Sequence, residues 1–362
     1  MDVLESTKSR IDDMKSYYGQ TLSTAEDLQS NICTIEEKQT RLELDAYGEV
    51  HPEVTRKAYG CGAVLPACLD GVRVLDIGCG AGRDAFALAR LVGPAGYVVG
   101  IDVTEEHIRF ANEYIGWHMK TFGFDRPNVE FHHGAMEDLE RIGLADDSFD
   151  VVVSNCVINL SAAKDQAFRE ILRVLKPGGE LYFSDIFANR RLDPVLANDP
   201  VLVGECIGDV MYTNDFYAMI RGLGIGETRR VRTTEKEVRN PTFKCQIGDV
   251  TLTSDTYRLF NLPLEMKCED YGQAAMYLGT IPGHPDAFVL DQGHIFQTKR
   301  AKLVCGNTAR MLADTRYARH FAMLGDRKQH FGPFGVAEAK DESTGIASAA
   351  PPPRKAASAC CG

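Results

Sequence analysis

Apolar runs alternate with amphipathic stretches through the middle of the chain. Five runs have the length and the β-branched or aromatic content of a buried strand, and they span residues 72–78, 97–102, 128–134, 149–157 and 180–185. The stretch between the last two runs has apolar residues at the spacing of one helix face, namely Phe168, Ile171, Leu172 and Leu175. Strands that alternate with helices predict an α/β fold, in which a parallel sheet is covered by helices on both faces.

The pattern divides the chain into four segments. Residues 1–60 are predicted to form a largely helical arm, and residues 61–231 the α/β domain. Residues 232–325 contain short β-rich runs, including 249–260, and a helical stretch, which together predict a small α+β domain. Residues 326–362 are rich in small residues, Ser and Pro, and we expect this tail to be disordered because it offers almost nothing to bury.

Composition and charge narrow the class of partner. The 362 residues carry 40 basic and 51 acidic side chains, a net charge of -11 that argues against nucleic acid and favours a neutral or cationic small substrate. No apolar run approaches the length of a membrane span, and the first residues are too charged for a signal peptide. We therefore expect a cytoplasmic, monomeric protein with no membrane partner.

The strongest chemical motif is "VLDIGCGAGRD", which begins at residue 74. A strand runs into Asp76, and then Gly78, Gly80 and Gly82 alternate through a turn into a helix. Glycines permit the sharp turn and let the backbone approach a ligand closely. Asp102 ends the second strand, where its carboxylate can accept hydrogen bonds from both ribose hydroxyls of a nucleoside.

This arrangement resembles the class I S-adenosylmethionine-dependent methyltransferases over about residues 60–231, including "FDVVVSNCVINL" and "LKPGGELYFSD". The resemblance implies a Rossmann-like sheet and S-adenosylmethionine as the cofactor. It also implies a set of cofactor-binding residues, which comprises Tyr59, Asp76, Gly78, Cys79, Gly80, Gly82, Asp102, Val103, Ala135, Met136, Glu137 and Asn155.

The chain contains 11 cysteines, an odd number that favours free thiols in a reducing compartment. It has no C-x-x-C pair and no zinc-finger spacing, so a structural zinc site is not expected. Cys156 follows the fourth strand, at the edge of the sheet where ligands bind. Because free cysteine is also among the most buried residue types, Cys156 by itself is equally consistent with core packing and with chemistry.

Five short motifs together resemble the arsenite S-adenosylmethionine methyltransferases: "YYGQ", "LQSNIC", "YGCG", "VVSNCVINL" and "GECIGD". The resemblance runs from about residue 17 to residue 231 and is weaker over the C-terminal domain. It implies four catalytic cysteines, with Cys156 and Cys206 as persistent arsenic ligands, Cys61 as the third ligand, and Cys33 as a transient disulfide partner of Cys61. The implied substrates are arsenite, its thiol conjugates and methylated arsenite, and the implied reductant is glutathione or thioredoxin.

Two other functions stay open. One is methylation of an organic acceptor, such as a quinone or a sterol, and the other is metalloid binding without catalysis. Four cysteines outside the five motifs are interpreted as structural, since Cys68, Cys245, Cys268 and Cys305 have no partner at a useful spacing. Cys360 and Cys361 are adjacent, and either collect arsenite for delivery or belong to an exposed tail without a role.

Overall fold

The computed structural model describes residues 3–22, 24, 27–34 and 39–335. The arm is helical, as expected, and its elements are α1 (Val3–Ser16), the π-helical turn η1 (Tyr17–Thr21), α2 (Arg41–Gly48) and α3 (Pro52–Arg56). Thr40 begins α2 with a capping box, in which its hydroxyl accepts from the amide of Glu43 and the Glu43 carboxylate accepts from the amide of Thr40.

The main sheet has eight strands in the order β3-β2-β1-β4-β5-β8-β7, with β6 paired to β5. These strands are β1 (Arg73–Ile77), β2 (Tyr97–Asp102), β3 (Val129–His133), β4 (Phe149–Asn155), β5 (Leu175–Ala188), β6 (Met211–Tyr212), β7 (Arg229–Lys236) and β8 (Leu252–Phe260). The first five strands pair in parallel, whereas β8 is antiparallel to both of its neighbours. The Rossmann-like class is confirmed, and it carries an antiparallel extension at one edge.

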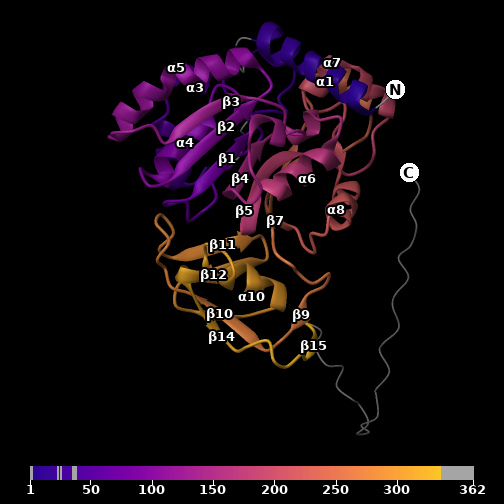
Figure 1. Cartoon of the computed structure of the whole chain (residues 1–362). Helices are drawn as coiled ribbons and strands as arrows, with labels where there is room; N and C mark the ends of the chain where they lie inside the picture. Colours follow the sequence, from indigo (N-terminus) through magenta and orange to yellow (C-terminus); the bar gives the residue numbers. More distant parts are fainter. Residues whose placement is uncertain (1–2, 23, 25–26, 35–38, 336–362) are drawn as a thin grey trace, which may run out of the picture.

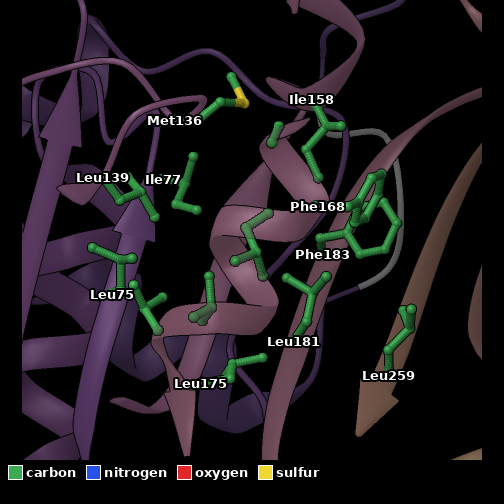
Figure 2. Close-up of a cluster of buried hydrophobic side chains, with 14 of the residues drawn as sticks. Leu75, Ile77, Met136, Leu139, Ile158, Phe168, Leu175, Leu181, Phe183 and Leu259 are labelled. Carbon is green, nitrogen blue, oxygen red and sulfur yellow. The ribbon is translucent and has the colours of Figure 1, made fainter. Parts of the chain in front are cut away.

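Alternate residues of the strands divide between two hydrophobic clusters, one on each face of the sheet. Val151 and Val153 of β4 join the cluster under α4 (Arg83–Val92) and α5 (Glu105–Phe122). Val152 joins the cluster under α6 (Lys164–Val174) and α8 (Thr213–Gly222), which Figure 2 shows with Phe168 packed against Phe183. The two helical layers lie on opposite sides of the strands in Figure 1. The central strands are therefore largely apolar, since both of their faces are covered by helices.

Short elements follow the main helices. They comprise η3 (Glu140–Ile142), η4 (Ile158–Leu160), η5 (Pro194–Asn198), α7 (Pro200–Gly204) and α9 (Pro241–Ile247). Residue Cys206 lies directly after α7, and η4 begins two residues after Cys156. Both cysteines thus belong to connections that are held by short helical turns.

The C-terminal domain is rich in strands and lies below the main sheet in Figure 1. Its elements are β9 (Glu269–Asp270), β10 (Gln273–Tyr277), β11 (Ala287–Asp291), β12 (His294–Gln297), β13 (Ala301–Val304), α10 (Gly306–Ala313), η6 (Ala318–His320), β14 (Phe321–Leu324) and β15 (Gly332–Pro333). A three-stranded sheet, β13-β10-β14, packs with α10 around a separate core.

Two segments differ from the sequence prediction. The run 249–260, which we expected in the small domain, forms β8 and pairs with β5 from Glu180↔Phe260 to Ala188↔Leu252. The main sheet therefore continues past residue 231, where we expected its domain to end. The tail was expected to begin at residue 326, but β15 pairs with β9, and within this segment the structure describes the residues up to 335. Cys360 and Cys361 lie outside the described part of the chain.

The sheet order fixes where a ligand can bind. Strands β1 and β4 are neighbours, but the connections from them proceed to opposite sides of the sheet, which opens a crevice at their carboxyl ends. Within the described residues, no helix has the length and apolar character needed to cross a membrane.

Candidate functional site

The loop between β1 and α4 is built for close approach of a ligand. Gly78 has a φ of 68°, and a Cβ atom at this position would lie 2.4 Å from the side chain of Val157. Gly80 donates its amide hydrogen to Oδ2 of Asp102 (2.9 Å), and Thr104 donates to Oδ1 of the same carboxylate (2.8 Å). The glycine loop and the end of β2 thus form one rigid cradle.

Two carboxylates in this cradle have opposite electrostatic character. Burial by itself would raise the pKa of Asp102. A hydrogen bond from His107, the charge of His107 and the two backbone amides outweigh burial, so the pKa of Asp102 lies below its ordinary value. Burial and repulsion from Asp84 and Asp102 raise the pKa of Asp76 well above its usual range. The Oδ2 atom of Asp76 is buried without a hydrogen-bond partner. An unsatisfied acceptor beside a glycine cradle suits a ligand that carries an ammonium group and a ribose.

A single cavity collects most of the predicted cofactor-binding residues. The expected residues that line it are Tyr59, Gly78, Cys79, Gly80, Asp102, Val103, Met136, Glu137 and Asn155. Three others lie elsewhere: Asp76 is buried in β1, Gly82 forms the N-cap of α4, and Ala135 faces an adjoining groove. The structure therefore places the predicted set around one site, with these three in supporting positions.

The arm contributes cavity walls that the sequence analysis missed. Arg10, Ile11 and Met14 of α1 and Tyr18 of η1 line the cavity. The Tyr18 hydroxyl donates to the carbonyl oxygen of Gly204 (2.5 Å), which fixes η1 on α7. The sequence predicted that the arm is helical, but it did not indicate which part of the protein the arm covers. That depends on contacts between residues more than 180 positions apart in the chain.

Three thiols meet at one end of this cavity. Cys156 Sγ lies 3.4 Å from Cys33 Sγ and 3.6 Å from Cys206 Sγ, and the three sulfur atoms all lie within 4.8 Å of one another. All three residues are buried, and Cys33 and Cys156 line the same cavity as the glycine cradle. Such a group can bind a soft, three-coordinate metalloid.

The backbone at two of these cysteines is strained. Cys156 has a φ of 61° and Cys206 a φ of 58°, a left-handed conformation that costs a non-glycine residue about 1–2 kcal/mol. Hydrogen bonds keep it in place, since the amide of Cys156 donates to the Ser184 carbonyl (2.7 Å) and that of Cys206 to the Val203 carbonyl (2.8 Å). Strain of this kind gathers where function requires a particular side-chain direction.

Cys61 lies beside the three thiols but outside the group. Its Sγ is 3.6 Å from Oγ of Ser184, and its amide donates to Oδ1 of Asn155 (3.1 Å). Asn155 also donates to Oδ2 of Asp84 (2.8 Å), so this side chain connects the Cys61 loop to the first turn of α4. The expected ligand trio contained Cys61, whereas the described structure places Cys33 in that position.

The three thiols are electrostatically unequal. Hydrogen bonds from the Cys156 and Cys206 thiols lower the pKa of Cys33 well below its ordinary value, despite burial, and the charge of Lys236 acts in the same direction. Burial and its hydrogen bonds with the neighbouring cysteines raise the pKa of Cys156. The pKa of Cys33 is therefore shifted in the opposite direction to those of Cys156 and Cys206, which makes Cys33 the most acidic thiol of the three.

Glu205 holds the segment that carries Cys33. Its Oε1 accepts from the Tyr17 hydroxyl (2.6 Å) and the Gln29 amide (2.6 Å), and its Oε2 accepts from the Ser30 amide (2.9 Å) and hydroxyl (2.5 Å). The carboxylate is fully buried. Sequence analysis noted the motif "GECIGD" for its cysteine and missed this acid, although an acidic residue in an apolar run is itself a signal.

Comparison with known proteins places the site in a family. A methyltransferase domain model matches residues 69–224, and a model described as the arsenite methyltransferase C-terminal domain matches residues 271–362. An arsenite methyltransferase of Aquipseudomonas alcaligenes is 49% identical over 89% of this chain and 92% of its own length. The chain belongs to the arsenite methyltransferase family.

Other members of the arsenite methyltransferase family agree with this assignment. The human arsenite methyltransferase is 35% identical over 97% of this chain and 96% of its own length. The crystal structure of an arsenic(III) S-adenosylmethionine methyltransferase from Chlamydomonas reinhardtii covers 82% of this chain and all (100%) of its own, with 42% identity and a TM-score of 0.79. As a member of the class I methyltransferases, this chain uses S-adenosylmethionine as its methyl donor.

The remaining described cysteines lie away from the cavity, except Cys79 of the glycine loop. Cys68 is buried with its Sγ 3.2 Å from Nε2 of His320, and Cys245 is exposed on α9. Cys268 and Cys305 lie in the C-terminal domain. The expectation for Cys360 and Cys361 falls outside the described residues.

Proposed function

We propose that this enzyme transfers methyl groups from S-adenosylmethionine to trivalent arsenic that is held by Cys33, Cys156 and Cys206. One observation carries the proposal: Cys33 and Cys156 line the same cavity as the glycine loop and Asp102. A methyl group presented from the cradle would face the metalloid across that cavity.

Arsenite binding begins at the sulfur atom of Cys33. The Cys33 thiolate attacks arsenic in neutral As(OH)₃ and displaces hydroxide, which takes up a proton from solvent. The thiols of Cys156 and Cys206 then each exchange for one further hydroxyl, and each of these exchanges releases one water. Metalloid binding drives the loss of the thiol protons, which leave as part of that water, and no separate base is needed. The three sulfur atoms raise the electron density on arsenic and leave its lone pair opposite them.

Methyl transfer depends mainly on how the enzyme positions the methyl donor and the arsenic acceptor. S-adenosylmethionine supplies an electrophilic methyl group on a sulfonium. The arsenic lone pair forms the As–C bond while the C–S bond breaks, and a neutral thioether departs, so the step requires no general acid. Asp102 and the glycine loop hold the donor side, and the strained backbones of Cys156 and Cys206 hold the acceptor side.

Transfer leaves arsenic in the pentavalent state, and two electrons return it to the trivalent state. The Cys61 thiolate attacks an arsenic-bound sulfur, an S–S bond forms, and the electron pair of the broken As–S bond remains on arsenic. The Cys61 side chain is close enough to interact with the Cys156 thiol through a hydrogen bond, which supports this assignment. An external thiol, glutathione or thioredoxin, then reduces the disulfide. Compared with the sequence expectation, Cys33 is the ligand and Cys61 is the exchanging partner.

The substrates under this proposal are arsenite, its thiol conjugates and methylated arsenite. Four buried, reduced cysteines at one site fit a reducing compartment, which supports a cytoplasmic location. A quinone or sterol methyltransferase would need no thiol trio, and a non-catalytic metalloid carrier would need no donor cradle. We therefore favour arsenite methylation over both alternatives.

A direct assay tests the proposal. The enzyme is incubated with arsenite, S-adenosylmethionine and glutathione, and methylated arsenicals are separated and measured. We expect methylated products from the wild type and from the exposed-cysteine control Cys245→Ser, and at least a 100-fold loss in Cys156→Ser. Methylation of an organic acceptor without any methylated arsenic would overturn the proposal.

A further inference from the structure

The C-terminal domain contains a second pair of cysteines at the start of α10. Cys305 is the N-cap of this helix, and its Sγ accepts from the amide of Thr308 (3.5 Å). The Thr308 hydroxyl lies 3.3 Å from the same sulfur and accepts a hydrogen bond from Arg229 (2.8 Å). The sulfur of Cys305 thus contacts both the amide and the hydroxyl group of Thr308.

Cys268 reaches the same place from the other side. Its Sγ is 3.8 Å from Oε1 of Glu227, which is 3.0 Å from Nη2 of Arg229. Glu227 also accepts from Asn307 in the first turn of α10 (3.0 Å). Cys268 is partly exposed, whereas Cys305 is buried. The pair therefore has one sulfur at the surface and one inside.

The charge distribution resembles that of the main thiol group. A hydrogen bond from Cys268 lowers the pKa of Cys305 to about 4, with help from Thr308 and Arg229 and against burial. The same hydrogen bond raises the pKa of Cys268. A helix N-terminus also favours a negative charge on its capping residue. Two thiols that are joined by a hydrogen bond and share the Glu227–Arg229 ion pair at the start of α10 form a two-coordinate site.

We propose that Cys268 and Cys305 form a second thiol site, which binds a trivalent arsenical that has two exchangeable positions, such as monomethylarsonous acid. Two As–S bonds form and two As–OH bonds break. The Cys268 thiol releases one water, the Cys305 thiolate releases hydroxide that takes up a proton from solvent, and the oxidation state of arsenic does not change. The choice of arsenical rests on the proposed function, since the ligand is its first methylated product. The two cysteines are 37 positions apart in the chain, which is why spacing in the sequence gave no sign of the pair.

The test uses phenylarsine oxide, which has two exchangeable positions, and intact-mass measurement of the full chain after washing with glutathione. The background variant lacks the other candidate chelating cysteines, through the substitutions Cys33→Ser, Cys156→Ser, Cys206→Ser, Cys360→Ser and Cys361→Ser. We expect this variant to retain one equivalent of phenylarsine oxide. Adding Cys305→Ser or Cys268→Ser should weaken retention at least about 100-fold, because chelation by two thiols is lost. Adding Cys245→Ser should change nothing.

Retention that survives Cys305→Ser would overturn the second site, as would a folded background that retains no arsenical. The otherwise wild-type chain gives a check that is independent of background folding, since Cys305→Ser alone should lower the number of bound equivalents by one, and an unchanged number would also count against the site. The background lacks the thiols of the main cavity, so either failure leaves the proposed function standing.

Discussion

Replacing Glu205 by Gln tests how the arm delivers Cys33 to the site. The buried carboxylate accepts four hydrogen bonds from Tyr17, Gln29 and Ser30. A glutamine side chain keeps one acceptor oxygen. Its NH₂ group replaces the other oxygen and cannot accept the two hydrogen bonds that this oxygen receives. Loss of two bonds to a charged acceptor, at roughly 1.5–3 kcal/mol each, destabilises the docked segment by about 3–6 kcal/mol.

Such a loss would raise the population of the undocked segment at least about 100-fold, since each 1.4 kcal/mol corresponds to a factor of ten. Hydrogen exchange of the Gln29 and Ser30 amides measures the opening directly, and titration with arsenite measures the loss of the Cys33 ligand. We expect faster exchange and weaker arsenite binding in Glu205→Gln. Ser30→Ala, which removes one bond, should show a smaller effect.

Glu237→Gln is the matched control, because the Glu237 side chain is 77% exposed and lies 3.7 Å from its partner Lys244. It should leave both readouts unchanged. If Glu205→Gln bound arsenite with wild-type affinity and showed wild-type exchange at Gln29 and Ser30, the positioning role of Glu205 would be refuted.

Three further changes have defined outcomes. Cys156→Ala should raise the pKa of Cys33 by removing a thiol donor, which is measurable as a shift in pH-dependent thiolate absorbance relative to the wild type; no shift would contradict the role of this hydrogen bond. Gly78→Ala should abolish S-adenosylmethionine binding in calorimetry, because its Cβ would lie 2.4 Å from Val157 at a φ of 68°. Burial lowers the pKa of His118 to about 4, whereas the unfolded chain protonates near pH 6.5. Stability should therefore fall as the pH drops through this window, by about 2 kcal/mol between pH 7.5 and pH 5 in urea unfolding. The His118→Asn variant should lack this contribution, and an equal loss in the variant would rule it out.

Local features of the site were predictable from the sequence because their determinants lie within a few residues. The glycines after Asp76 lie in the turn between β1 and α4, and Asp102 lies at the end of β2, just before α5. Each feature is thus part of a single strand–turn–helix unit. Alternating apolar runs likewise predicted the parallel strands. The Rossmann-like class could thus be read from short-range pattern alone.

Long-range features were not predictable in the same way. Cys33 and Cys156 meet although they are 123 residues apart, and the position of Cys33 depends on how Glu205 anchors the segment that carries it. The left-handed backbone of Cys156 has no propensity signal, since the fold imposes it. The run 249–260 reads as an ordinary strand, and only its pairing with β5 shows which sheet it joins.

The central claim is that Cys33, Cys156 and Cys206 hold arsenic beside the donor cavity. Arsenic K-edge X-ray absorption of the arsenite-loaded enzyme counts the sulfur ligands directly. We predict three sulfur ligands in the wild type and in Cys61→Ser, and two in Cys33→Ser. Three ligands in Cys33→Ser together with two in Cys61→Ser would contradict the account.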